Sequence, residues 1–274
     1  MSLRVTSREY KVMLNTGRFE DREDGCGAIW ELIDFLANRQ ASLTGDVRIE
    51  KTLKDGKPDD ELREVCYFDT PAQALRQSGF ILRVRSETSK SGKNKYQTTL
   101  KYRDADRHLA ASKNVEPTIE IDDDDRKFEE DVVPQFQVKY SRSTSFKTND
   151  EPGFRSQGEV VDIFPGLASL EISGKTAVGR VKGFTAFEFA RKAGVIEFEA
   201  GTEVKCALSF WYLTEKRAGR PVVAEFSFDF DDVDEDFPIK TVTGANALFA
   251  SLQKQSGWVD LSSSTKTAYA YDAL

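Results

Sequence analysis

Apolar and polar residues alternate over much of this chain, which is the pattern of strands that are half buried in a sheet. Two such segments flank a stretch of hairpin-loop composition at 89–94, so they are expected to pair antiparallel. The predicted strands are 4–14, 80–87, 96–103, 115–122, 176–182, 195–199, 204–214 and 222–231.

Helical spacing is confined to a few segments. The apolar residues of 25–40 and of 245–256 recur every three or four positions and predict two amphipathic helices. Asp69 supplies a capping side chain and Gly79 suits a left-handed C-cap, so a short helix is expected over 72–78. Many strands, few helices and no internal repeat favour one closed β architecture over βαβ units.

The stretch 134–158 follows neither pattern. It is rich in Ser, Thr, Lys, Asn and Pro without a sustained period, which indicates a long connection. Just before it, the segment 127–131 is interpreted as an exposed helix start in preference to a source of acids at a tunnel mouth. The sequence therefore predicts a single domain over 1–274, with a loop excursion at about 134–158.

The polar faces of the predicted strands carry rows of like charge. For any one strand the simpler interpretation is a sheet with its charges in water. Several such strands, with large aromatic residues opposite the charges, favour a closed barrel that turns the charges inward, and such an interior predicts a highly charged ligand. The rows pair Arg83 with Arg85, Lys101 with Arg103, Glu120 with Asp122, Glu197 with Glu199, and Glu225 with Asp229 and Asp231.

Composition and charge narrow the classes of function. With 39 Lys and Arg against 46 Asp and Glu, the net charge of −7 excludes a globally basic nucleic-acid coat. No segment reaches the roughly 18 to 20 apolar residues that cross a bilayer, and an apolar signal core is missing, so a cytoplasmic protein is expected. Cys26, Cys66 and Cys206 are too far apart for a CxxC clamp, and His108 is the only histidine. Chemistry is left to carboxylates, ammonium and guanidinium groups, hydroxyls or a hard metal.

Four blocks in this order resemble the signature of the CYTH domain of the triphosphate tunnel metalloenzymes. They are Tyr-Phe-Asp-Thr-Pro at 67–71, Leu-Arg-Val-Arg at 82–85, Thr-Leu-Lys at 99–101 and Lys-Thr-Ala-Tyr at 266–269. That superfamily includes thiamine triphosphatases, inorganic triphosphatases and class IV adenylyl cyclases. The resemblance implies an α+β, mainly β fold, a closed eight-stranded antiparallel tunnel with a few covering helices. Basic side chains would hold a triphosphate there, and carboxylates would hold Mg²⁺ or Mn²⁺.

This chain departs from the family pattern in the metal-binding motifs. Lys11 stands where the Glu-x-Glu-x-Lys motif that begins at Glu9 has its second glutamate, and Met13 stands where it has lysine. Ser227 replaces the second glutamate of the late Glu-x-Glu strand that begins at Glu225. The candidate site comprises Lys11 and Glu120 as catalytic residues, Arg83, Arg85, Lys101, Arg103, Arg180, Lys182, Lys205 and Lys266 as phosphate-binding residues, and Glu9, Glu225, Asp229, Glu197 and Glu199 as metal ligands.

Three classes of function remain open: an enzyme that acts on a triphosphate, a binding module and a carrier. Hydrolysis of the terminal phosphate of tripolyphosphate, thiamine triphosphate or ATP is the leading hypothesis, with cyclisation as in an adenylyl cyclase second, since no base-reading pocket is recognisable. The substitutions at Lys11 and Ser227 motivate a catalytically weak or inactive module that binds polyphosphate or a nucleotide. A β-barrel carrier of an apolar ligand would need its aromatic rows inside. Neither nucleic acid nor a membrane is expected as a partner, and the protein is expected to be a monomer or a homodimer.

Overall fold

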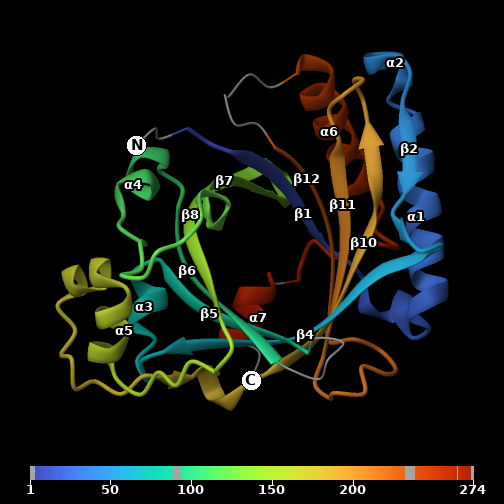
Figure 1. Cartoon of the computed structure of the whole chain (residues 1–274). Coiled ribbons are helices and arrows are strands. Elements are labelled where there is room, and N and C mark those ends of the chain that lie inside the picture. The colour runs from blue at the N-terminus through green and yellow to red at the C-terminus, as the bar shows by residue number, and fades with distance from the viewer. Residues whose placement is uncertain (1–3, 89–93, 232–237, 264, 273–274) are drawn as a thin grey trace.

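The computed structural model describes residues 4–88, 94–231, 238–263 and 265–272. Within these ranges, nine strands form a closed barrel, because β4 pairs with β10 and closes the ring (Figure 1). In ring order the strands are β10 (Ala186–Glu197), β11 (Val204–Tyr212), β12 (Val223–Asp231), β1 (Ser7–Met13), β7 (Arg126–Val133), β8 (Gln137–Thr148), β6 (Asn94–Asp104), β5 (Phe80–Thr88) and β4 (Lys57–Asp69).

The closed barrel is confirmed, but the expectation of eight antiparallel strands is wrong. β1 pairs with β7 in parallel, whereas the other neighbours in the ring are antiparallel. β5 and β6 pair antiparallel as expected, and most of the predicted hairpin loop between them lies outside the described residues. Three short strands flank the ring: β2 (Arg48–Lys51), β3 (Leu53–Lys54) and β9 (Gly179–Arg180).

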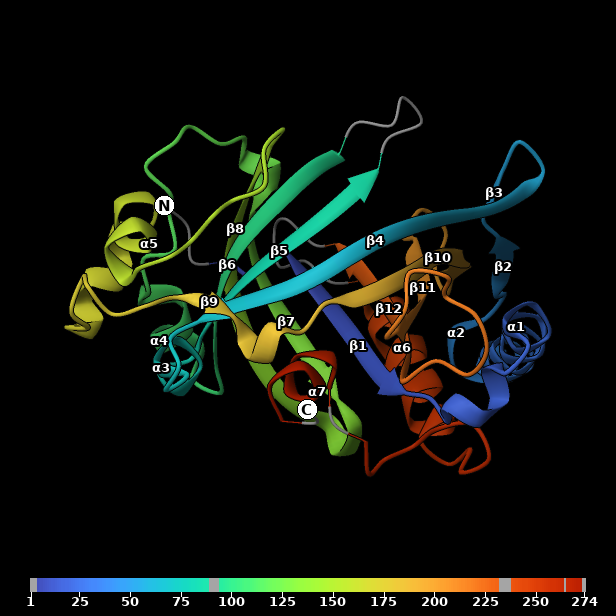
Figure 2. The same cartoon turned by 90° about the horizontal axis from the view of Figure 1, so that it is seen from below.

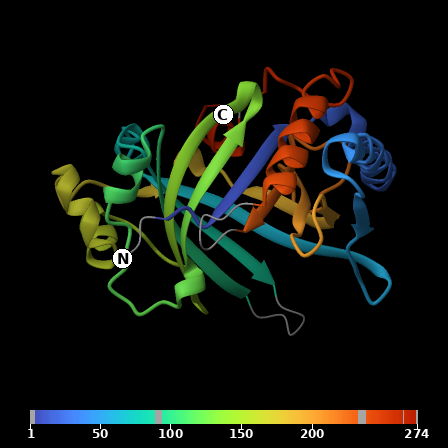
Figure 3. The same cartoon turned by 90° about the horizontal axis from the view of Figure 1, so that it is seen from above.

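Helices cover the barrel on two sides and at one end. In the turned views, α1 and α6 lie beside β10, β11 and β12, whereas α3, α4 and α5 lie on the opposite side (Figures 2 and 3). α7 lies at one end of the barrel and is seen inside its outline in Figure 1. The helices in the described ranges are α1 (Arg22–Asn38), α2 (Ala41–Thr44), α3 (Ala74–Gln77), α4 (Arg107–Ser112), α5 (Gln157–Ile163), α6 (Ile239–Leu252) and α7 (Lys266–Asp272).

None of the helices in the part of the chain that the structure describes combines the length and the apolar character needed to span a bilayer.

The outward faces of the strands build the core. Phe226, Phe228 and Phe230 of β12 are at most 1% exposed and pack in one cluster with apolar residues of α1 and α6. Tyr10 of β1 stacks on Phe228 with 4.9 Å between ring centroids, and Phe249 of α6 completes this contact. The alternate residues of the same strands face the barrel interior. The same alternation of side chains along each strand therefore places large aromatic residues outside the barrel and charged residues inside it.

Several predicted elements differ from the structure in the middle of the chain. The segment 115–122 is not a strand; the helix start expected at 127–131 is part of β7, and much of the connection expected at 134–158 is β8. β8 escaped recognition because its outward face carries Arg142 and Thr144 instead of an unbroken apolar row. These two side chains donate hydrogen bonds to the carbonyl oxygens of Ala111 and Val115. The predicted strand 176–182 is reduced to the two residues of β9 and a 3-10 turn.

The contact between α1 and the barrel depends on the absence of a side chain at Gly194. A Cβ atom there would lie 2.0 Å from Trp30 Cη2 and 2.6 Å from the carbonyl oxygen of Glu50. We expect Gly194→Ala to lower the free energy of unfolding by about 1–3 kcal/mol, because overpacking forces α1 or β2 to shift. The measurement is equilibrium unfolding in urea.

Gly27→Ala on α1 is the matched control, because a Cβ there meets nothing within 4 Å. It should be neutral or stabilise the helix by up to about 1 kcal/mol. Equal urea midpoints for the two variants would contradict this account of the contact.

Candidate anion-binding cavity

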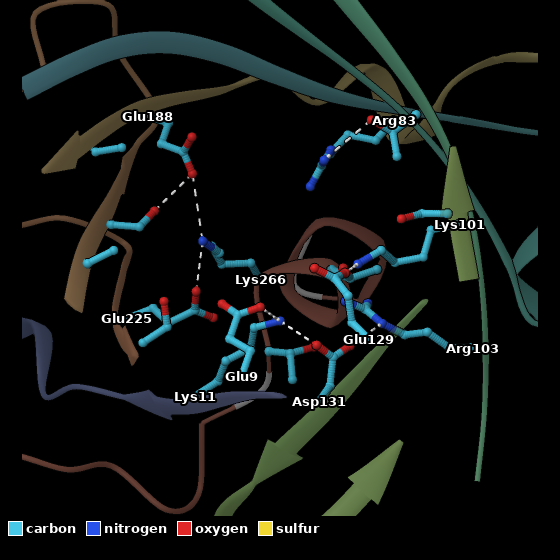
Figure 4. Close-up of a pocket in the computed structure, with 18 of the residues that line it drawn as sticks. Glu9, Lys11, Arg83, Lys101, Arg103, Glu129, Asp131, Glu188, Glu225 and Lys266 are labelled. Atoms are coloured by element: carbon cyan, nitrogen blue, oxygen red, sulfur yellow. Dashed lines mark hydrogen bonds and ion pairs between the residues drawn. The ribbon is translucent and has the colours of Figure 1, made fainter. Parts of the chain in front are cut away.

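The barrel encloses a cavity of about 690 Å³ (Figure 4). Among its described lining residues nine are basic and five are acidic, so the cavity is positive although the whole chain carries −7. A cavity of this kind concentrates anions of several charges. The basic residues are Lys11, Arg63, Arg83, Arg85, Lys101, Arg103, Lys127, Lys139 and Lys266, and the acidic ones are Glu9, Glu129, Asp131, Glu188 and Glu225.

Strand alternation places these side chains in the interior, because every second residue of a barrel strand faces inward. Each strand thus supplies a short row, and hydroxyl groups of β6 and β8 lie between the charges. The rows include Glu9 and Lys11 on β1, Arg83 and Arg85 on β5, Thr99, Lys101 and Arg103 on β6, Glu129 and Asp131 on β7, Ser143 and Ser145 on β8, and Glu225 and Ser227 on β12.

Lys11 lies between two carboxylates. Its Nζ atom is 2.7 Å from Glu9 Oε2 and 2.8 Å from Asp131 Oδ1. The other oxygen of Asp131 accepts hydrogen bonds from Arg103 Nε at 3.2 Å and from Ser141 Oγ at 3.1 Å. Burial alone would lower the pKa of Lys11 and raise that of Asp131. The opposite charges outweigh burial, so the pKa of Lys11 is raised, that of Asp131 is lowered, and both groups stay charged.

A second ion pair joins β6 to β7. Lys101 Nζ lies 2.8 Å from Glu129 Oε2. Burial lowers the pKa of Lys101 in spite of the carboxylate. Burial would raise the pKa of Glu129, but the ammonium group of Lys101 outweighs it and holds that pKa below its usual range. The lowered pKa of Glu129 keeps this carboxylate ionised beside Lys101.

Lys266, the first residue of α7, connects two further carboxylates across the cavity (Figure 4). Its Nζ atom is 2.8 Å from Glu225 Oε1 and 3.7 Å from Glu188 Oε1. Glu188 is 1% exposed, and burial would raise its pKa. The nearby cations Arg85 and Lys266 outweigh burial and lower the pKa of Glu188. Lys266 thus forms ion pairs with Glu225 and Glu188, as Lys11 does with Glu9 and Asp131.

Arg83 and Arg85 differ from the other inward charges. The Nε atoms of both are buried without a hydrogen-bond partner, and within the described ranges neither guanidinium has a carboxylate at ion-pair distance. Arg83 donates a long hydrogen bond of 3.4 Å to Thr99 Oγ1. Burial, followed by the charge of Arg85, lowers the pKa of Arg83 to about 9, so it remains a cation at neutral pH. These two guanidinium groups are therefore the candidate anion-binding groups of the cavity.

Several predicted site residues lie outside this cavity. Glu120 is exposed in the loop before β7, and Lys182 is exposed in the turn after β9. Arg180 pairs with Glu151 on the outer surface. The prediction placed these three residues by strand alternation. It fails because 115–122 and most of 176–182 are not strands.

Four other predicted residues lie beyond the end of the cavity. Lys205 and Asp229 are directly opposite each other in the ladder of β11 and β12, past the last cavity residues of those strands, and Lys205 pairs with Asp231. Burial and the charge of Glu9 raise the pKa of Asp229 to about 7. Glu197 lies 3.6 Å from Arg48 in a separate side pocket, and Glu199 follows the end of β10.

Sequence reasoning missed three acids of the cavity. Glu129 and Asp131 share the inward face of β7 with Lys127, an alternation that the helix interpretation of 127–131 obscured. Glu188 lies in the first half of β10, a strand predicted only at its end. The alternation around it, with Phe189 buried on the face opposite the acid, was the available signal.

The cavity carboxylates do not fit the Mg²⁺ or Mn²⁺ that the CYTH resemblance implies. Each of the five is already within ion-pair distance of a lysine or arginine. Within the described ranges no three His, Cys, Asp or Glu side chains are grouped to hold a metal ion. Mg²⁺ needs carboxylate oxygens that are not already held by ammonium or guanidinium groups, so these acids, as paired here, do not present a preformed divalent-cation site.

Neither a family model nor a curated protein matches the chain. Among solved structures, HpAC1 of Hippeastrum, a candidate adenylyl cyclase described as having a dominant triphosphatase activity, is 13% identical and has a TM-score of 0.49, with 98% of this chain and 96% of that one covered. A candidate adenylate cyclase of Bacillus halodurans is 14% identical, with a TM-score of 0.41 and 97% of both chains covered. The PH1819 protein of Pyrococcus horikoshii is 15% identical, with a TM-score of 0.34 and coverages of 93% and 91%. All three TM-scores are below 0.5.

The buried carboxylate of Glu188 provides a test of the charge balance. It accepts hydrogen bonds from Ser209 Oγ at 2.8 Å and Trp211 Nε1 at 3.0 Å, and it faces Lys266 and Arg63. We expect Glu188→Gln to lower the free energy of unfolding by about 3 kcal/mol at pH 7, because two cations lose a buried partner. The measurement is urea unfolding at a series of pH values.

The direction of the pH dependence follows from the lowered pKa of Glu188. A depressed pKa gives stability that is present above the ordinary glutamate pKa and is lost as pH falls through the folded value. The difference in free energy of unfolding between wild type and Glu188→Gln should be constant from pH 8 to pH 6. It should become smaller only below about pH 4. Glu50→Gln, at an exposed pair with Arg48, should change nothing measurable. A difference that disappears by pH 6 would contradict this interpretation.

Proposed function

We propose that this protein binds a triphosphate-containing small molecule in the barrel cavity and hydrolyses its terminal phosphate. The observation that carries the proposal is the pair Arg83 and Arg85, two inward guanidinium groups that lack a carboxylate partner in the described part of the chain. Guanidinium groups bind phosphate oxygens through paired hydrogen bonds. A ligand with one carboxylate would balance only part of the positive excess, whereas linked phosphates bring several charges in one short molecule.

The other cations can contact the remaining phosphates. Lys101 and Arg103 on β6 continue the basic wall that begins with Arg83 and Arg85, and Lys11 and Lys266 reach in from other elements. During phosphoryl transfer, charge is spread over the transferred group and the leaving oxygen, so cations already fixed around the ligand stabilise it. In this proposal Lys11 contacts the leaving phosphate.

The lining favours an inorganic or small organic triphosphate over cyclisation of a nucleotide. Two aromatic residues line the cavity within the described ranges, Tyr67 and Trp211, and they are 4% and 1% exposed. The indole nitrogen of Trp211 donates to Glu188, and the ring packs near Tyr67 and Phe184. Neither ring offers an open face to a nucleobase, so recognition rests on charge and hydroxyl groups.

A module that binds the triphosphate without turning it over is the second candidate. It is favoured by the ion pairing of Glu129, Asp131 and Glu188, because a carboxylate whose pKa is lowered by cations is a weak base toward water. The two candidates share the binding site and differ only in whether product forms.

Phosphate release from tripolyphosphate, thiamine triphosphate and ATP, measured with Mg²⁺, with Mn²⁺ and with chelator, tests the proposal. We expect Arg83→Met with Arg85→Met to lower kcat/KM by at least about 100-fold, because two charge-assisted contacts are lost. Arg48→Met, at a side chain that is 68% exposed, is the matched control and should leave the rate unchanged.

Binding without product would favour the second candidate. In that case tripolyphosphate still raises the melting temperature of wild type but not that of the double variant. If tripolyphosphate neither turns over nor stabilises the wild-type protein, both candidates are contradicted.

A stability measurement without ligand tests whether the arginine pair lowers the stability of the free protein, as expected of residues that are present for binding and not for folding. We expect Arg83→Met to raise the free energy of unfolding by about 1–2 kcal/mol, because methionine removes a buried cation that has no carboxylate at ion-pair distance among the described residues. Urea unfolding in phosphate-free buffer measures this change. A loss of stability equal to that of an ordinary core substitution would show that Arg83 has a structural role instead.

A further inference from the structure

Two lysines occupy the places between carboxylates in this cavity. Lys11 lies between Glu9 and Asp131, with 2.7 and 2.8 Å from its Nζ atom to their oxygens. Lys266 lies between Glu225 and Glu188 in the same way, at 2.8 and 3.7 Å. Figure 4 shows both ammonium groups with acids on either side. The two lysines come from opposite ends of the chain, β1 and α7, and together engage four of the five cavity acids.

An ammonium group in this position excludes a divalent cation. Mg²⁺ binds carboxylate oxygens at about 2.0–2.1 Å and keeps a rigid octahedral shell. An ion that shared Glu9 with Asp131 would therefore stand within a few ångströms of Lys11 Nζ, where like charges repel. Asp131 is further held by Arg103 and by Ser141, which fixes its oxygens toward donors of this chain.

On the wall formed by β5, cations lack an acidic partner at ion-pair distance in the described part of the chain. Arg83 and Arg85 have no described carboxylate at ion-pair distance, and their Nε atoms are buried without a hydrogen-bond partner. They can balance phosphate oxygens directly, without a metal as intermediary. Mg²⁺ bound to an oligophosphate removes two units of its negative charge and occupies oxygens that the arginines would otherwise contact. Chelation therefore weakens the attraction that this wall provides.

We infer that the cavity binds the free oligophosphate anion in preference to its magnesium chelate, with Lys11 and Lys266 as built-in cations in place of a metal. The inference rests on the proposed function, since it requires that an oligophosphate binds in the cavity at all. It adds the ionic form of the ligand, which the proposed function leaves open.

Calorimetric titration of the full chain with tripolyphosphate, once in chelator and once with excess Mg²⁺, tests the inference. We expect binding in chelator and a dissociation constant at least about tenfold higher with Mg²⁺, the effect of losing roughly one charge-assisted contact. Binding that requires Mg²⁺, or is tightened by it, overturns the inference and leaves the proposed function standing. Absence of binding under both conditions overturns both.

Replacing Lys11 by glutamate should reverse the effect of Mg²⁺ on the binding of tripolyphosphate. Lys11→Glu places a third carboxylate beside Glu9 and Asp131, so we expect weaker binding in chelator and recovery with Mg²⁺. Lys11→Gln removes the charge without adding a ligand and should bind weakly under both conditions. Recovery of Lys11→Gln by Mg²⁺ to the same degree would contradict the account.

Direct metal binding gives a second readout that does not depend on the phosphate ligand. Titration with Mn²⁺ followed by electron paramagnetic resonance should detect no bound ion in wild type and one in Lys11→Glu. Lys254→Glu makes the same charge change at an exposed position outside the cavity lining and should behave as wild type. A tightly bound Mn²⁺ in wild type would overturn the inference even if the variants fail to fold.

Discussion

Charges that are turned into a closed barrel must find their partners there, and this constraint organises the molecule. Breaking a buried ion pair typically costs about 3–5 kcal/mol, because one charge is left alone in a poorly solvating interior. The acids of this cavity meet the constraint with lysines and arginines of neighbouring strands. Arg83 and Arg85 do not meet it within the described chain. The proposed anion would supply the negative charge that these two guanidinium groups lack at ion-pair distance.

The C-terminal helix connects the fold to this charge balance. α7 presents Lys266 to the cavity, and its other end is tied to the end of β4 and to α3. Tyr271 donates a hydrogen bond to Asp69 Oδ2 at 3.3 Å, and Arg76 holds Asp272 with two contacts of 2.6 and 2.7 Å. Asp69 also accepts from backbone N–H groups at the start of α3. One buried carboxylate thus fixes a helix start and the element that carries a cavity lysine, which gives a physical reason for aspartate in the block at 67–71.

Sequence patterns revealed which way the side chains face more reliably than where along the barrel they lie. Clean alternation in 80–87 and 222–231 placed the two arginines and Glu225 on the inner face, and the structure brings them together with Lys101, Arg103, Lys11, Glu9 and Lys266. The same alternation included Lys205 and Asp229, which lie past the end of the cavity, because a period of two carries no information about depth. β8 and the first half of β10 were missed because polar side chains interrupt their apolar faces, and the parallel pairing of β1 with β7 has no local signature.

The substitution at position 11 is more than the loss of an acid. Lysine in place of glutamate changes the local charge by two units, so it removes an oxygen ligand and supplies a cation at the same point. A chain that had merely lost a ligand would leave Glu9 and Asp131 as close acids without compensation. Instead Lys11 bridges them, and Arg103 supports Asp131 from β6. The altered motif and the pairing of the cavity acids are thus one electrostatic arrangement, in which the Lys11 ammonium group supplies positive charge at the position where the motif has an acid.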